Sequence, residues 1–282
     1  MRSYLLGPAI ALVLAADLSL AQTYRSEIDL AYTRMEIIDF PYHVGAVRGT
    51  YYFSPVKTAN HPLAEAAFLE KANNVSLSYS HRDGDQSYSY GSYRHEASYT
   101  QEVINADVEI FIPNSIFYIA AGVTRHDVES RFTVSSLNTD GTTDIELPTS
   151  QASNRDSSWH GSLGITPVDG LLVWSTFYED VDLDDHWNLN AKYVFDWSGN
   201  AVNIEGDYRN NANYDSFSII SDYYFDSSFS IGAGYNYVDT SAVDDSFLLR
   251  TRKFFTENVS INAEYITDDS VDIYTLGISL RF

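Results

Sequence analysis

Apolar and polar residues alternate along most of the chain, which is the pattern of half-buried β-strands rather than of helices. From Phe229 to Tyr237 the odd positions are aromatic or aliphatic, whereas the even positions are serine, glycine and asparagine. The same period of two recurs at residues 27–33, 187–195, 202–209 and 259–265. The sequence therefore predicts an all-β protein whose strands have one apolar and one polar face.

Aromatic residues stand at or near the ends of several of these segments, with smaller aliphatic residues between them. Trp187 and Phe195 bracket one segment, and Tyr274 and Phe282 bracket another. Rings at both ends of an apolar band are typical of β-barrels that cross a membrane. Strands of a soluble β-sandwich also alternate, but the charges on the polar face favour a transmembrane antiparallel barrel.

Short and longer connections alternate along the chain. The short ones lie at residues 113–114, 167–170, 196–199, 226–228 and 256–258, and the longer acidic ones at 179–185, 239–245 and 267–272. Short turns on one rim and longer loops on the other are the layout of bacterial outer-membrane barrels. Counting the segments predicts about 14 strands, with 12 or 16 as alternatives because residues 82–103 are ambiguous. The stretch from Asp127 to Arg155 is expected to be a long loop that either narrows the barrel or lies outside it as a flap.

One segment departs from the strand pattern. The stretch HPLAEAAFLEKA, from His61 to Ala72, has a proline near its start, strong helix formers and apolar residues at helical spacing. Its position between the second and third strands places this short helix on the side of the short turns, which is the periplasmic side. Two interpretations remain open: a cap packed against the barrel rim, or a plug or docking helix.

The first 21 residues have the pattern of an export signal, with a basic residue, an apolar run and small residues before the expected cleavage site between Ala21 and Gln22. Residues 22–282 would then form a single barrel. The chain contains no cysteine and carries a formal net charge of -22, so disulfides are excluded and nucleic acid is not an expected partner. We expect no cofactor and no specific metal site.

Four stretches resemble a known family. The segments AQTYRSEIDLAY, GTYYFSPV, PLAEAAFL and TLGISLRF together are similar to the putative general bacterial porin family of Gram-negative outer membranes. The resemblance implies an outer-membrane β-barrel pore, and it implies no characterised set of functional residues.

The last strand carries a candidate assembly signal. Thr275, Gly277, Leu280 and Phe282 fit the spacing that the barrel assembly machinery of the outer membrane recognises. An unpaired last strand can add to a sheet edge and then close the barrel by pairing with the first strand. Within this strand, Tyr274, Leu276, Ile278 and Leu280 are expected to contact lipid.

Charged residues on the polar strand faces are candidate pore-lining groups, because rings of charged side chains set the ion preference of a pore. The same residues could instead brace the wall. The candidates are Glu27, Asp29, Lys192, Glu205, Asp207, Arg209, Arg250, Arg252 and Glu264.

Acidic residues gather in the longer loops. Asp180, Asp182, Asp184 and Asp185 resemble the start of a calcium loop but lack its later glycine and glutamate. A diffuse acidic rim could recruit divalent cations and, through them, lipopolysaccharide. It would also include Asp239, Asp244, Asp245, Asp268, Asp269 and Asp272.

The function that these features predict is passive diffusion of small hydrophilic solutes and ions through a water-filled barrel. Two alternatives are a substrate-specific channel, for example for oligosaccharides, and a non-conducting barrel that serves as adhesin or structural anchor. Catalysis is not expected, since the serine-hydrolase elbow, the zinc-protease motif and a phosphate-binding glycine loop are missing. The sequence leaves monomer and homo-oligomer open.

Overall fold

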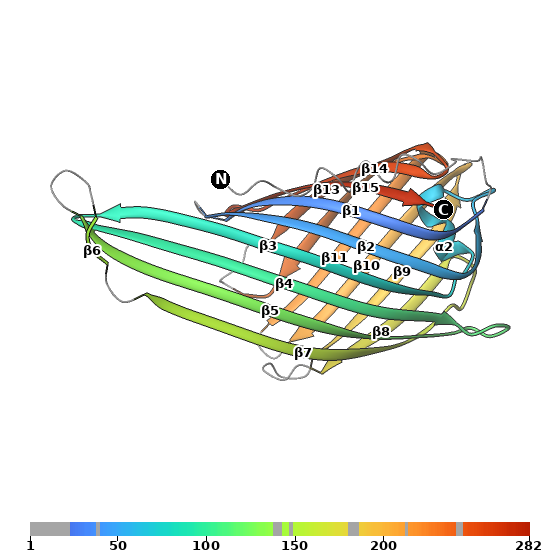
Figure 1. Ribbon diagram of the computed structural model, residues 1–282. Helices are drawn as coiled ribbons and strands as arrows, with labels where there is room; N and C mark the ends of the chain where they lie inside the picture. The colour runs from blue at the N-terminus through green and yellow to red at the C-terminus, as the bar shows by residue number, and fades with distance from the viewer. Residues whose placement is uncertain are drawn as a thin grey trace.

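The computed structural model describes residues 23–37, 40–137, 143–146, 149–179, 186–211, 214–240 and 245–282. Its strands form one antiparallel sheet that closes on itself, because β1 pairs with β15 and β4 pairs with β5. Fourteen strands make the closed ring, and the short β6 pairs only with the far end of β5. The predicted 14-stranded transmembrane barrel is therefore confirmed (Figure 1).

The strands alternate in direction around the ring. Their bounds are β1 Thr23–Ile37, β2 Phe40–Lys57, β3 Asn74–Tyr90, β4 Tyr93–Phe111, β5 Phe117–Leu137, β6 Thr143–Glu146, β7 Ser150–Ile165, β8 Leu171–Glu179, β9 His186–Trp197, β10 Asn200–Asn211, β11 Tyr214–Asp226, β12 Phe229–Val238, β13 Ser246–Thr256, β14 Val259–Thr267 and β15 Val271–Arg281.

The barrel has the inverse of a soluble protein's distribution of polarity. Apolar side chains such as Leu163 and Leu276 are 66% and 62% exposed on the outside, whereas Asn203 and Ser260 are fully buried inside. Lipid can cover the outer apolar surface, and each strand needs only one apolar face to provide it. The apolar positions of the alternating pattern thus face outward, and the polar positions face the inside of the barrel.

The last strand closes the ring as expected. β15 pairs with β1, and the side-chain hydroxyls of Thr33 and Thr275 are hydrogen-bonded at 2.9 Å. The main-chain N–H groups of Arg25 and Ser26 both donate to the carbonyl of Phe282. Of the residues expected to face lipid, Tyr274, Leu276 and Ile278 are exposed, and Leu280 is half-buried.

The predicted helix is present and shorter than the sequence suggested. A 3₁₀ turn, η1 (Leu63–Glu65), continues into α2 (Ala66–Leu69), whereas the pattern predicted a helix from His61 to Ala72. It connects β2 to β3 and lies on the rim that carries the short turns and Phe282 (Figure 1). Among the residues described, no helix is long and apolar enough to cross a membrane.

We call residues 58–73 the inner segment, because its contacts reach opposite parts of the ring. The N–H of Leu63 donates to the carbonyl of Ser227 in the β11–β12 turn at 2.7 Å, and Arg281 of β15 donates to the carbonyl of Leu63 at 2.8 Å. Farther along the segment, Lys71 donates to Thr166 beyond the end of β7. The inner segment therefore lies across the periplasmic end of the barrel rather than on its outer edge.

A small apolar core anchors the inner segment to the wall. Tyr24 and Tyr52, whose rings meet edge to face at 5.4 Å, pack with Val56, Ala66 and Ala72. All five are buried. This cluster joins β1 and β2 to the start of α2 and to Ala72 after it. The segment is therefore held by apolar contacts at one side and by polar contacts at the others.

Some strands continue well beyond the membrane on the side opposite α2. β3, β4 and β5 contain 17, 19 and 21 residues, whereas β8 and β14 contain nine, and a strand needs only about 9–11 residues to cross the bilayer. Figure 1 shows these strands extending past the rest, with β6 near their tip.

This extension corrects the predicted loop from Asp127 to Arg155. Both residues lie in strands and face each other in register, joined by an ion pair. Residues 82–103, which were ambiguous, form β3, a two-residue turn and β4. A strand that has left the bilayer needs no apolar outer face, so the hydrophobic signal vanishes while the pairing continues.

An ion-pair network in the barrel lumen

The inner face of the barrel contains all nine charged residues singled out from the sequence. On each strand they alternate with exposed apolar neighbours, such as Leu189 and Tyr193 around Lys192, or Ile204 beside Glu205. That they line a conducting pore stays a prediction. The nine are Glu27, Asp29, Lys192, Glu205, Asp207, Arg209, Arg250, Arg252 and Glu264.

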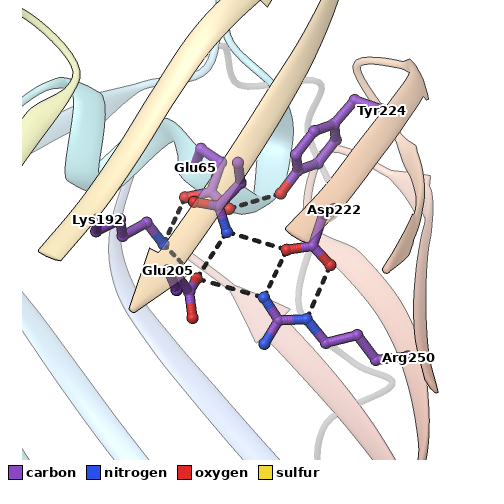
Figure 2. A network of polar contacts seen from close by, with 7 residues as sticks. Glu65, Lys192, Glu205, Asp222, Tyr224 and Arg250 are labelled. Atoms are coloured by element: carbon purple, nitrogen blue, oxygen red, sulfur yellow. Dashed lines mark hydrogen bonds and ion pairs between the residues drawn. The ribbon is translucent and has the colours of Figure 1, made fainter. Parts of the chain in front are cut away.

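Three of them, Lys192, Glu205 and Arg250, meet in one network with Asp222 of β11. Arg250 of β13 binds Asp222 through two donors, at 2.8 and 2.5 Å, and its guanidinium lies 3.3 Å from Glu205 of β10. Asn203 donates to both carboxylates, at 2.7 and 2.9 Å. Such a bidentate pair is geometrically specific. Figure 2 shows the two carboxylates gathered around one guanidinium.

Glu65 of the inner segment completes this network. Its carboxylate lies 2.8 Å from the amine of Lys192 and accepts a hydrogen bond from the hydroxyl of Tyr224 at 2.6 Å. Lys192 also donates to Glu205 at 3.2 Å. Glu65 is 4% exposed, so its charge needs these partners. The network therefore joins the inner segment to four strands of the wall, β9, β10, β11 and β13 (Figure 2).

Asp222, Tyr224 and Glu65 are not among the site residues predicted from the sequence. Asp222 and Tyr224 stand on the polar face of β11, so the alternation in residues 217–225 could have placed them inside. For Glu65 no local signal exists, because its partners lie more than a hundred positions away in the chain. Only the closure of the barrel brings it to Lys192 and Tyr224.

A second pairing fixes the seam between the first and last strands. Arg281 forms an ion pair with Glu27, and Ser279 donates to Asp29 at 2.5 Å. The guanidinium of Arg281 also lies over the rings of Tyr24 and Phe254, at 4.4 and 4.6 Å. Arg281 is 3% exposed. Glu27 and Asp29 thus brace the wall, which is one of the two roles considered for them.

Glycines make room for two of the lumen pairs. Gly232 stands in register between Asp222 and Arg250, on the strand that separates theirs. A methyl group at Gly232 would lie within 3.0 Å of the Asp222 carboxylate carbon and 2.9 Å of a backbone oxygen. Gly122 stands in the same way between Asp107 and His160, which are 3.1 Å apart. Each glycine allows two side chains to meet across an intervening strand.

The substitution Gly232→Ala is expected to destabilise the folded barrel by about 1–3 kcal/mol, because the added methyl group overlaps the Asp222–Arg250 pair. Urea unfolding of the protein in detergent or lipid vesicles measures this change. The control is Gly206→Ala on β10, where the closest atom to the new methyl group would be 3.9 Å away. Equal stability of the two variants would contradict the proposed role of Gly232.

The network borders an internal cavity of ≈ 250 Å³. Carboxylates and basic groups face each other across this space, which is open and polar rather than packed with apolar side chains. Such a site can hold water and let small ions exchange with the charged wall. Its lining includes Glu65, Lys192, Glu205, Asp222, Arg250, Arg252 and Glu264.

Some of the predicted sites lie outside the described residues. These are the cleavage site and several loop aspartates: Ala21, Gln22, Asp180, Asp182, Asp184, Asp185 and Asp244.

Two residues of the candidate assembly signal, Thr275 and Gly277, face the inside of the barrel. A methyl group at Gly277 would lie 2.6 Å from Asn262. The absence of a side chain at Gly277 is thus needed for packing against Asn262, whether or not the assembly machinery recognises this residue. In the described part of the chain, no three or more metal-ligating side chains cluster to hold a metal ion.

A closed antiparallel barrel with an apolar outside and a charged inside is the architecture of outer-membrane porins. The chain matches the family of putative general bacterial porins over residues 2–282, and it belongs to that family. It is therefore an outer-membrane β-barrel of the porin type, a group that is normally non-enzymatic.

The chain is similar to solved structures, and the one with a TM-score above 0.5 agrees with this fold. The outer membrane protein Omp33 of Acinetobacter baumannii has 20% identity and a TM-score of 0.65, over 93% of this chain and 99% of that one. A triple mutant of the porin of Rhodopseudomonas blastica has 8% identity and a TM-score of 0.43, over 91% of this chain and 99% of that one. No curated protein matches the chain.

Proposed function

We propose that this barrel is a passive channel through which small hydrophilic solutes and ions diffuse across the outer membrane. The observation that carries the proposal is the charged, cavity-containing lumen inside a closed ring of 14 strands. Water and small ions can occupy such an interior, whereas an anchor without transport would need no open polar space. Membership of the porin family supports the same function.

We infer that the inner segment restricts this channel. Its contacts with the β11–β12 turn, with β15 and with Thr166 favour a plug over a cap that only covers the rim. The anchoring is partly polar, through Glu65 and Lys192. A plug held by a few polar contacts can move aside while the strands stay paired.

The channel is expected to prefer cations, because the chain is strongly acidic and carboxylates stand in the lumen. Conductance in planar bilayers tests whether the protein forms a pore, and the reversal potential under a salt gradient tests whether the pore prefers cations. The double variant Asp207→Asn, Glu264→Gln should move the reversal potential toward zero, since both side chains face inward. Glu129→Gln on the outer face of β5 serves as the control. A folded protein that opens no pores would refute the channel and favour an adhesin or anchor.

Three further proposals concern assembly and surroundings. Residues 1–21 would be removed on export, and the last strand would be recognised by the barrel assembly machinery. The acidic rim would recruit divalent cations that bridge to lipopolysaccharide. Two rim carboxylates are already engaged by tyrosines, because Tyr235 donates to Asp245 and Tyr265 donates to Asp272. Asp268 accepts hydrogen bonds from the N–H groups of Ser270 and Val271. Among the described rim carboxylates, recruitment would therefore depend mainly on Asp239 and Asp269, together with the rim aspartates outside the described residues.

A further inference from the structure

The strands that continue beyond the membrane form a projection with two unlike faces. We call it the flange: residues 84–99 of the β3–β4 hairpin, 128–137 of β5 and 150–155 of β7. Its outer face continues the lipid-facing side of Tyr79 and Ile104 but carries charges. These are Asp85, Arg94, Glu96, Glu129, Arg131 and Arg155. The flange therefore lies outside the hydrocarbon layer, in contact with water or lipid headgroups.

The inner face of the flange is aromatic, which reverses the pattern found inside the membrane. Tyr88 and His95 are in register and stack at 4.8 Å with an angle of 9° between their planes, and His95 meets Phe132 at 5.9 Å. Tyr90 is 79% exposed and Phe132 42% exposed. Large rings thus stand uncovered on the surface that continues the lumen wall.

Arg82 lies at the inner end of this aromatic face. Its guanidinium sits 4.4 Å from the ring centre of Tyr42 and 5.7 Å from that of Tyr99. The ion pairs of the described residues do not include Arg82, and its buried Nε has no hydrogen-bond partner there. Its other polar contact is with the sulfur of Met35 at 3.3 Å, which is a weak acceptor.

The charge around Arg82 is unusual for so acidic a chain. From the row of Arg82 outward, none of the described inner-face positions of β3, β4, β5 and β7 is acidic. The positions beside Arg82 in register are Val44, Gln101, Val128 and Asn154. A guanidinium without a carboxylate partner can form charge-assisted hydrogen bonds with an anion.

We propose that the inner face of the flange binds aromatic carboxylates at the channel mouth, with Arg82 holding the carboxylate and the ring of Tyr99, which lies on the next inner-face row, contacting the aromatic body. Successive inner-face rows are about 7 Å apart along a strand, so a benzoate-sized molecule spans the gap from Arg82 to the next row. This inference rests on the proposed function, because it names the class of solute that the channel would take up.

Other occupants fit this face less well. A sugar acid would direct several hydroxyl groups at Val44, Val128 and the ring of Tyr99, so only those near Gln101 and Asn154 would find partners, and unpaired hydroxyls oppose binding. Lipid chains are excluded by the charged outer face and by the position beyond the membrane. The face is continuous with the lumen wall, so what reaches it from outside is a solute on its way into the channel.

Isothermal titration of the full-length protein, folded in detergent, with sodium benzoate tests the site directly. Benzoate should bind more tightly than acetate or glucuronate. Arg82→Gln should weaken benzoate binding about tenfold or more, because a charge-assisted bond is lost, and Tyr99→Ala should weaken it several-fold. Arg94→Gln is the matched control, since Arg94 stands on the opposite face of β4 beside His95, and it should leave binding unchanged.

The result separates this inference from the channel itself. If benzoate binds no better than acetate, if glucuronate binds best, or if Arg82→Gln leaves the affinity unchanged, the site is refuted whether or not the protein conducts. If the protein opens no pore but binds benzoate through Arg82, the channel fails and the site stands. Conductance in sodium benzoate, measured on the same variants, should show transient block that Arg82→Gln reduces.

Discussion

Replacing residues 62–70 with a flexible glycine–serine linker is expected to raise the single-channel conductance several-fold. The inner segment crosses the periplasmic end of the lumen, and its removal would leave the wall strands paired and the bore wider. A wider water-filled bore passes more ions. Planar-bilayer recording of the folded variant measures the change, and heat-modified migration on gels verifies that the barrel is closed.

The milder variant Glu65→Ala should raise conductance less and increase its fluctuations, because it removes the contacts with Lys192 and Tyr224 and keeps the apolar anchor. Glu70→Ala is the matched control: Glu70 lies on the same segment and pairs with His61 of that segment at 3.1 Å. If the folded linker variant conducts like the unaltered protein, the inner segment is a cap and not a plug.

The substitution Phe282→Ala is expected to lower the amount of folded protein in the outer membrane several-fold while export continues. Phe282 is 42% exposed, and its backbone carbonyl accepts bonds from Arg25 and Ser26 at the seam. The substitution keeps these backbone bonds and removes the ring, so a loss of assembly would identify the ring as the recognised group. Fractionation and the rate at which the heat-modifiable form appears measure the effect.

Phe255→Ala provides the comparison for Phe282→Ala. Phe255 is 65% exposed on β13, close to the same rim, so its removal costs a similar apolar surface without touching the seam. Phe282→Tyr should restore assembly. Normal assembly of Phe282→Ala would show that the candidate signal does not depend on its last aromatic residue.

Much of the barrel wall was predictable because neighbouring residues on a membrane strand face opposite sides, one toward lipid and the next toward the lumen. Lys192 alternates with Leu189 and Tyr193 on its strand, and Arg250 with Leu249, so the sequence alone places both charges opposite the lipid side. The short turns at residues 113–114 and 256–258 were equally visible, because turn residues interrupt the alternation.

The flange was missed for the same physical reason. Asp127 and Arg155 sit in paired strands beyond the bilayer, where both faces meet water and the outer residues need not be apolar. The alternation of hydrophobicity therefore disappears, and polar strands with many serines have the composition of a loop. The aromatic inner face, with Tyr88, His95 and Phe132, becomes visible only when the register of three strands is known.

By itself the sequence determined the class of the protein: alternation fixed an antiparallel barrel, its approximate strand number, the inward position of the charged residues and a helix between the second and third strands. The tertiary structure decided how those parts meet. Glu65 contacts Lys192 and Tyr224, and the absence of a side chain at Gly232 leaves space for the Asp222–Arg250 pair. Arg82 lies between two tyrosine rings and has no carboxylate partner. The reason is that alternation is a local property of a strand, whereas register and closure depend on pairing between residues far apart in the chain.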